Sequence, residues 1–237
     1  MEPFRRFLKC NLISVPSPLN PSRKKHRFGK AWMHEHVSDA YVREAQRLGY
    51  RSRSAFKLIE LAEKDKLFRR GMTVVDLGAA PGSWCQVLRE RLGPQARILA
   101  VDILPMTPLP GVTFVQTDFS SDEGLIAVQA ALGGARADLV LSDMAPNLSG
   151  IDSVDQARSV HLAELALEFA CTALQPGGDF VVKLFQGAGL AEFQRAVSEH
   201  FAKAYVRKPK ASRDRSREIF IVAKGATRVV KSSTPQA

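Results

Sequence analysis

The stretch "VVDLGAAPGSW", residues 74–84, joins a buried strand to a helix through a turn that contains two glycines. Its first half is a short β-branched run, typical of strands that are buried on both faces. Gly78 and Gly82 allow the backbone to approach a ligand closely, and the N–H groups that open the following helix can bind it. This stretch therefore predicts a strand–turn–helix unit with a ligand site at the turn.

Strand and helix patterns alternate along most of the chain on both sides of this unit. The alternation predicts a doubly wound α/β fold, with a mostly parallel sheet and helices on both faces. The seven expected strands cover residues 72–78, 96–104, 111–119, 137–146, 177–187, 203–209 and 217–225. In such sheets, ligands bind outside the carboxyl ends of the strands.

The last two predicted strands break the alternation. A parallel return requires a crossover of roughly a dozen residues or more, usually helical. The basic loop between residues 203–209 and 217–225 is shorter and has no helical pattern. We therefore predict a hairpin with an antiparallel last strand. Glu218, at the start of that strand, then lies at the carboxyl ends of the parallel strands, here called the ligand edge of the sheet.

Four carboxylates lie at or near predicted strand ends, and they bear on the type of cofactor. Asp102 can accept hydrogen bonds from both ribose hydroxyls, which suits NAD and S-adenosylmethionine equally. The turn lacks the G-x-G-x-x-G pattern, and Asp76 just before it would repel a pyrophosphate but suit a cationic group. Asp118 is expected to accept from an adenine amino group, and Asp143 to end the fourth strand. Together these acids favour S-adenosylmethionine over NAD.

Lys183 lies in the middle of the apolar strand "GGDFVVKLFQG", residues 177–187. A buried ammonium is costly unless it is paired. If the strand that ends near Asp143 is its neighbour, Lys183 meets Asp143 at the sheet edge, where Glu218 also arrives. A structural salt bridge is the alternative, although buried pairs often add little net stability.

Composition indicates a basic protein that binds an anionic partner. The 237 residues have a formal net charge of +10, which suits nucleic acid but also an anionic membrane or an acidic protein. We expect residues 1–31 to form a disordered basic arm, residues 32–225 a single domain, and residues 226–237 a flexible tail. The three cysteines and five histidines show no metal-ligand spacing, so no metal site is predicted.

Five motifs resemble the bacterial FtsJ-type ribosomal RNA large-subunit 2′-O-methyltransferases. They are "RSRSAFKL" (51–58), "VVDLGAAPGSW" (74–84), "SDMAPNLSG" (142–150), "VVKLFQG" (181–187) and "RKPKASRDRSREIFIVAKG" (207–225). The resemblance implies a Rossmann-like methyltransferase fold, with S-adenosylmethionine as methyl donor. It also implies an acceptor, a uridine ribose in the peptidyl-transferase region of 23S rRNA, within the 50S subunit or a late precursor.

The resemblance also implies the site residues. The catalytic set falls on Lys57, Asp143, Lys183 and Glu218. The cofactor contacts fall on Gly82, Trp84, Asp102, Asp118 and Asp143. We expect Lys183 to lie closest to the 2′-oxygen, as a general base or as a cation that stabilises a developing alkoxide.

Several alternatives remain open at the level of sequence. The substrate could be tRNA or another RNA, or the chain could be a non-catalytic ribosome-assembly factor on the same fold. We expect a monomeric cytoplasmic protein without a membrane segment, and mitochondrial targeting by the basic arm is the alternative location. RNA contacts are expected from Arg51, Arg53, Lys57, Arg207, Lys208, Lys210, Arg213, Arg215 and Arg217.

Overall fold

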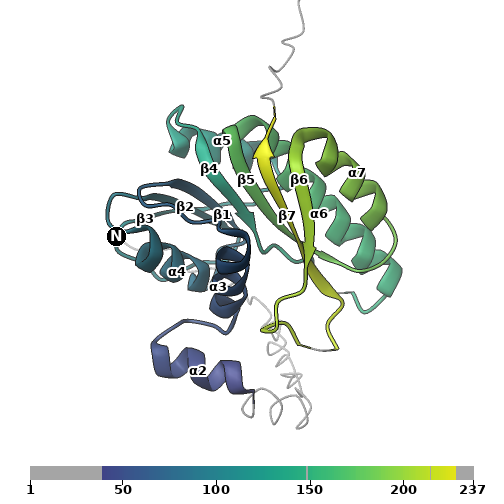
Figure 1. Ribbon diagram of the computed structural model, residues 1–237, viewed down its shortest axis with the longest axis horizontal. Helices are drawn as coiled ribbons and strands as arrows, with labels where there is room; N and C mark the ends of the chain where they lie inside the picture. Colours follow the sequence, from purple (N-terminus) through teal and green to yellow (C-terminus); the bar gives the residue numbers. More distant parts are fainter. Residues whose placement is uncertain (1–38, 148, 214, 228–237) are drawn as a thin grey trace, which may run out of the picture.

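The computed structural model describes residues 39–147, 149–213 and 215–227, so the predicted basic arm lies outside the described residues (Figure 1). A seven-stranded sheet of order β3-β2-β1-β4-β5-β7-β6 forms its centre. The strands are β1 (Thr73–Leu77), β2 (Arg97–Asp102), β3 (Val112–Gln116), β4 (Ala137–Ser142), β5 (Leu174–Phe185), β6 (Phe201–Arg207) and β7 (Glu218–Ala226). The predicted domain of residues 32–225 begins outside the described residues, and β7 continues through Ala226.

The predicted direction of each strand is confirmed. Strands β1 to β5 pair with one another in parallel. Strand β7 lies antiparallel between β5 and β6, because the connection after β6 is too short for a crossover. Lys183 in β5 is registered with Phe220 in β7, and Phe185 is registered with Glu218.

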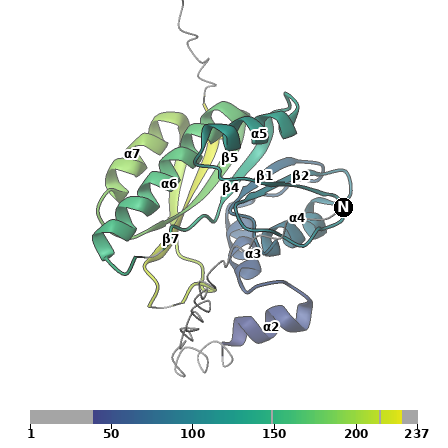
Figure 2. The ribbon, with the colours of Figure 1, turned by 180° about the vertical axis from the view of Figure 1, so that it is seen from behind.

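The described part of the chain contains six helices. They are α2 (Ala40–Leu48), α3 (Ser54–Asp65), α4 (Ser83–Leu92), α5 (Asp122–Leu132), α6 (Asp152–Ala173) and α7 (Leu190–His200). Five of them, α3 to α7, cover the two faces of the sheet (Figure 1 and Figure 2). Figure 1 shows α3 and α4 on one side of the sheet, and Figure 2 shows α5, α6 and α7 from behind, on the other side.

Each face of the sheet has its own apolar core, because alternate residues of each strand point to opposite sides. Leu58 of α3 and Leu88 of α4 pack with Val74 of β1 in one core. Phe169 of α6 and Phe193 of α7 belong to the other core. Both faces are covered, so the central strands read as nearly continuous apolar runs.

The ligand edge of the sheet is the end where α2 and the loop between β6 and β7 lie (Figure 1). Because β7 runs antiparallel, its first residue, Glu218, lies at the end where the parallel strands finish.

Among the described residues, no helix combines the length and the apolar character that a membrane span requires.

Candidate active site

Lys183 and Asp143 form an ion pair at the carboxyl ends of β5 and β4. Lys183 Nζ lies 2.9 Å from Asp143 Oδ1 and donates a hydrogen bond to the backbone oxygen of Asp143 at 2.6 Å. The Lys183 side chain is only 9% exposed, and that of Asp143 is 17% exposed. Burial strengthens this pairing, because little water screens the two charges.

Lys57 and Glu218 form a second ion pair beside the first. Lys57 Nζ, from α3, lies 2.6 Å from Glu218 Oε1 at the start of β7. The same oxygen accepts a hydrogen bond from Ser212 Oγ at 2.7 Å. Lys57 Nζ also lies 5.9 Å from the centre of the Phe220 ring, and Phe220 is the residue registered with Lys183.

The two pairs are coupled electrostatically. Burial alone raises the pKa of Glu218, but the charge of Lys57 and the hydrogen bonds from Lys57 and Ser212 lower it more. The charge of Lys183 adds to this lowering, and the net pKa lies below the ordinary value. Lys57, Asp143, Lys183 and Glu218 therefore form a single cluster of alternating charges.

The remaining predicted acids line the other strands of the same edge. Asp102 ends β2 and accepts hydrogen bonds from the backbone N–H groups of Ala80 and Leu104, both at 2.8 Å. Asp118 lies two residues beyond β3 and is exposed, and hydrogen bonds from Ser120 lower its pKa. Asp102 thus fixes the glycine-containing turn, while the carboxylate of Asp118 faces solvent.

Asp76 is an acid whose surroundings the sequence does not reveal. It is fully buried in β1, where the thiol of Cys85 donates to its Oδ2 at 3.2 Å. Burial raises its pKa to about 7; the Cys85 hydrogen bond opposes this rise, and the neighbouring charges of Asp143 and Asp102 add to it. Its Oδ1 is buried without a hydrogen-bond partner among the described residues.

Gly82 and Trp84 occupy the turn and the start of α4. Gly82 has a φ of 103°, and the N-terminal N–H groups of α4 follow it. Trp84 is buried, with 2% of the residue exposed, and its Nε1 donates to the backbone oxygen of Ser54 at 2.8 Å. Trp84 can therefore reach a ligand at the turn through its backbone, while its ring packs in the core.

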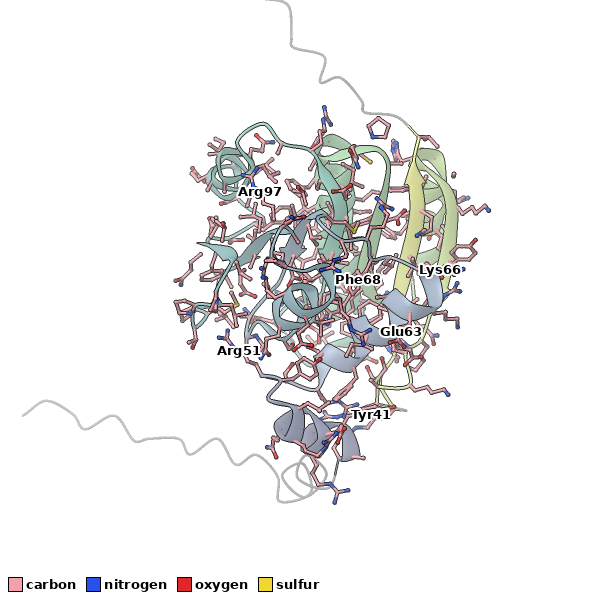
Figure 3. The ribbon with its side chains drawn as sticks, turned by 60° about the vertical axis from the view of Figure 1, so that its left-hand side comes forward. Tyr41, Arg51, Glu63, Lys66, Phe68 and Arg97 are labelled. Carbon is pink, nitrogen blue, oxygen red and sulfur yellow. The ribbon has the colours of Figure 1, made fainter. Side chains whose placement is uncertain are left out.

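Arg51 holds two loops together at this turn (Figure 3). Its Nη1 donates to the backbone oxygens of Pro81 at 2.9 Å and Thr107 at 2.7 Å, and its Nη2 donates to that of Pro108 at 3.2 Å. A Cβ atom added at Gly82 would lie 2.7 Å from Arg51 Nη1. The expectation that Arg51 contacts RNA therefore has a competing explanation, in which Arg51 fixes the two loops at this turn.

A basic cleft of about 520 Å³ opens beside the second ion pair. Its lining residues are Arg53, Lys57, Ala211, Arg213, Arg215, Ser216 and Glu218. Arg207, also expected to contact RNA, forms a bidentate ion pair with Asp65 instead, with a closest distance of 2.6 Å. The cations around this cleft are Arg53, which directly precedes α3, Lys57 in α3, and Arg213 and Arg215 in the loop between β6 and β7.

Metal ligands are not grouped anywhere in the described part of the chain. Within residues 39–147, 149–213 and 215–227, no three His, Cys, Asp or Glu side chains are placed to hold a metal ion. His34 and His36 lie outside these ranges.

Comparisons with known proteins identify relatives over most of the chain. The sequence model of the FtsJ-like methyltransferase family matches residues 50–226. A protein named Ribosomal RNA large subunit methyltransferase E from Azoarcus sp. (strain BH72) is 58% identical over 199 residues, which cover 84% of this chain and 97% of that protein. A protein of the same name from Alkalilimnicola ehrlichii is 56% identical over 204 residues, covering 86% of this chain and 98% of the relative.

One solved structure is similar to this chain in both fold and sequence. A Plasmodium falciparum protein assigned as a ribosomal RNA methyltransferase superposes with a TM-score of 0.68 and is 30% identical in sequence. The match covers 76% of this chain and 100% of that chain.

Proposed function

Because the chain belongs to the FtsJ-like methyltransferase family, we propose that it methylates the ribose 2′-hydroxyl of a uridine in 23S rRNA, with S-adenosylmethionine as methyl donor. The observation that carries this proposal is the coupled Lys183–Asp143 and Lys57–Glu218 pairs, which lie between a row of carboxylates and a basic cleft.

The residues at the acid-lined edge fit S-adenosylmethionine. Asp76 has a buried carboxylate oxygen without a hydrogen-bond partner in the described residues, which suits a ligand that carries positive charge. Asp102 ends β2 with acceptor capacity left for ribose hydroxyls, because a carboxylate has about four lone-pair sites. Asp118 would accept from the adenine amino group, and Gly82 and the backbone of Trp84 would border the cofactor.

The chemistry requires an activated methyl group, an aligned hydroxyl and an acceptor for its proton. When bound, S-adenosylmethionine supplies a methyl group that its sulfonium already activates. The protein then has to orient the weakly nucleophilic ribose oxygen, and to take up its proton or stabilise the negative charge that develops on it.

Lys183 is the residue best placed for that task. Two contacts with Asp143 fix its Nζ, which leaves one more position on the nitrogen for the 2′-oxygen. In the neutral form this position is a lone pair that takes up the hydroxyl proton, and in the charged form it is an N–H that stabilises the developing alkoxide.

Lys57 and Glu218 would complete the pocket around the ribose. Glu218 is fixed by Lys57 and Ser212, so its second carboxylate oxygen can accept from a ribose hydroxyl or support the charge of Lys183. The basic cleft beside them would hold the RNA phosphates.

The cellular context belongs to the same proposal. The relatives are named for the large ribosomal subunit RNA, and we expect the substrate to be the 50S particle or a late precursor, modified in the cytoplasm by a monomeric enzyme. Methylation of tRNA or another RNA is the rival activity, and a non-catalytic assembly role is the rival of a different class.

The test is a map of 2′-O-methylation in ribosomal RNA from cells that lack the protein. We expect one uridine of the peptidyl-transferase region of 23S rRNA to lose its methyl group and to regain it when the wild-type gene is restored. A complete 23S map together with a missing methyl group in tRNA would support the rival substrate. Unchanged maps of both RNAs would contradict the proposed activity.

A further inference from the structure

A second cleft, here called the outer cleft, adjoins the one that holds Lys57 and Glu218. Its volume is about 370 Å³, within the roughly 300–1,000 Å³ of typical ligand sites. Its lining residues are Asp39, Tyr41, Arg53, Lys210, Ser212, Arg213 and Arg215. Arg53, Arg213 and Arg215 line both clefts, so a ligand that extends from one cleft enters the other.

We propose that the outer cleft binds the nucleotide next to the one whose ribose is methylated. In this proposal the neighbouring base stacks on Tyr41, and cations of the cleft hold the phosphate that links the two nucleotides. The inference rests on the proposed function, since it names a second binding subsite for the same RNA.

The charges of the outer cleft suit a phosphate. Four of its lining residues are cationic, and Asp39 is the one acid among them. Asp39 is already used inside the protein, because it pairs with Arg53 and caps α2 by accepting from the backbone N–H of Tyr41 at 3.0 Å. The cleft therefore keeps a positive surplus that a polyanion would neutralise.

Arg213 carries an unsatisfied donor in this cleft. Its Nε is buried without a hydrogen-bond partner in the described residues, and Asp39 Oδ2 lies 4.0 Å away. A buried N–H without a partner costs free energy unless a ligand or water accepts from it. A phosphate oxygen in the outer cleft would supply that acceptor.

Tyr41 supplies an aromatic wall beside these cations. Figure 3 shows it on α2, on the side turned toward the loop between β6 and β7. The guanidinium of Arg53 lies 5.5 Å from the centre of its ring, and the Phe56 ring supports it at 5.5 Å between centres. A ring held in this way offers a platform for a base of any identity, because every base has a π face.

The outer cleft is also linked to the candidate catalytic cluster. Ser212 lines the outer cleft, and its hydroxyl donates to Glu218, which pairs with Lys57. A nucleotide bound against Ser212 would therefore lie next to the ribose site.

The test compares Tyr41→Ala with Tyr205→Ala in methyl transfer to 50S particles from cells that lack the protein. Tyr205 is a matched control, because it also contacts an arginine, Arg207, at 4.6 Å from its ring centre, but it lines neither cleft. We expect Tyr41→Ala to raise KM for the particles roughly 5- to 150-fold, with kcat and affinity for S-adenosylhomocysteine retained. Tyr41→Phe and Tyr205→Ala should stay within about twofold of wild type, since both leave the stacking platform in place.

Salt dependence gives an independent readout. Lys210→Gln should lower the slope of log affinity against log salt concentration by about one, as expected for the loss of one phosphate contact. An unchanged slope, or equal KM values for Tyr41→Ala and Tyr205→Ala, would overturn the inference. So would a Tyr41→Ala variant that loses cofactor affinity or unfolds at a lower temperature while Tyr41→Phe behaves like wild type, because the ring would then have a structural role.

Binding of a short single-stranded oligouridine, followed by fluorescence anisotropy, separates this inference from the proposed function. If wild-type protein fails to methylate 50S particles, the proposed function fails. Weaker oligouridine binding by Tyr41→Ala than by Tyr205→Ala would still support the outer cleft as a nucleotide subsite, and equal binding would reject it.

Discussion

The ligand edge of the sheet has two halves of opposite charge. The half over β1 to β4 is acidic, and the half beside α3 and β7 is basic. The acidic half contains Asp76, Asp102, Asp118 and Asp143, and the basic half contains Arg53, Lys57, Lys210, Arg213 and Arg215. Lys183, paired with Asp143, lies where they meet. This division suits a reaction between a cationic methyl donor and a polyanionic RNA, because each half attracts one substrate and repels the other.

Two carboxylates show how different the halves are. Burial raises the pKa of Asp76 to about 7, and the charges of Asp143 and Asp102 add to this rise. Glu218 is also desolvated, yet the cations and hydrogen-bond donors around it bring its pKa below the ordinary value. The same type of group is thus held toward its neutral form in one half and toward its charged form in the other.

Loss of the Lys183 side chain, at the boundary between the acidic and basic halves, should have the largest effect on activity. We expect Lys183→Ala to lower kcat by roughly 10²–10⁴-fold, the range of general acid–base and oxyanion contributions, while S-adenosylhomocysteine still binds. Lys224→Ala is the control, because Lys224 also pairs with a buried acid, Asp179 at 2.7 Å, but belongs to neither half. Radiolabelled methyl transfer and calorimetry measure the two quantities, and equal activity of the two variants would remove Lys183 from the mechanism.

Loss of the Arg51 hydrogen bonds, which join two loops of the acidic half, should have a smaller effect. Arg51→Ala removes the hydrogen bonds to Pro81, Thr107 and Pro108, so the KM for S-adenosylmethionine should rise roughly tenfold or more, with little change in KM for RNA. Arg97→Ala is the matched control, since Arg97 also donates to a backbone oxygen, that of Ala131 at 2.7 Å, away from this edge. If Arg51→Ala raised the KM for RNA instead, Arg51 would belong to the basic half.

The acidic half should lose stability as the pH rises. The pKa of Asp76 is about 7 in the folded protein against 3.8 in the unfolded reference, so the folded state binds the proton more tightly. Its contribution to the free energy of unfolding is full below the unfolded value and declines until the pH passes about 7. The free energy of unfolding of Asp76→Asn, measured with urea, should therefore increase relative to that of wild type by on the order of a few kcal/mol between about pH 5 and pH 8. A constant difference between the two proteins would contradict the shift.

The basic half should show the opposite and smaller dependence. The pKa of Glu218 is depressed, so its stabilising contribution is present above the unfolded value of 4.5 and is lost as the pH falls through the lower folded value. Glu218→Gln should therefore be less stable than wild type at neutral pH, and the difference should shrink in acid. A difference that grows on acidification would mean that Lys57 and Ser212 do not stabilise the charged form.

The sequence alone was sufficient to predict the architecture of the sheet and several of the residues at its ligand edge. The connection before Glu218 is too short for a crossover, so it predicts a hairpin that places Glu218 near Lys183, and the register of β5 with β7 confirms this. Strand ends supplied Asp102 and Asp143 by the same logic, because parallel strands finish at one edge.

The side-chain partners could not be predicted, because tertiary contacts decide them. Arg51 and Arg207 are indistinguishable from RNA-binding arginines in sequence, yet one donates to three loop carbonyls and the other pairs with Asp65. Tyr41 and Ser212 carried no signal, since their positions depend on how α2 and the loop between β6 and β7 meet.

The measurement that tests the division most directly is the affinity of Asp102→Ala for each ligand, measured side by side. Calorimetry with S-adenosylhomocysteine should show a loss of roughly 10- to 100-fold, because a charged hydrogen-bond acceptor is removed. Binding of 50S particles should be unchanged, since Asp102 lies in the acidic half. Loss of affinity for both ligands together, or for the particles alone, would contradict an edge divided between cofactor and RNA.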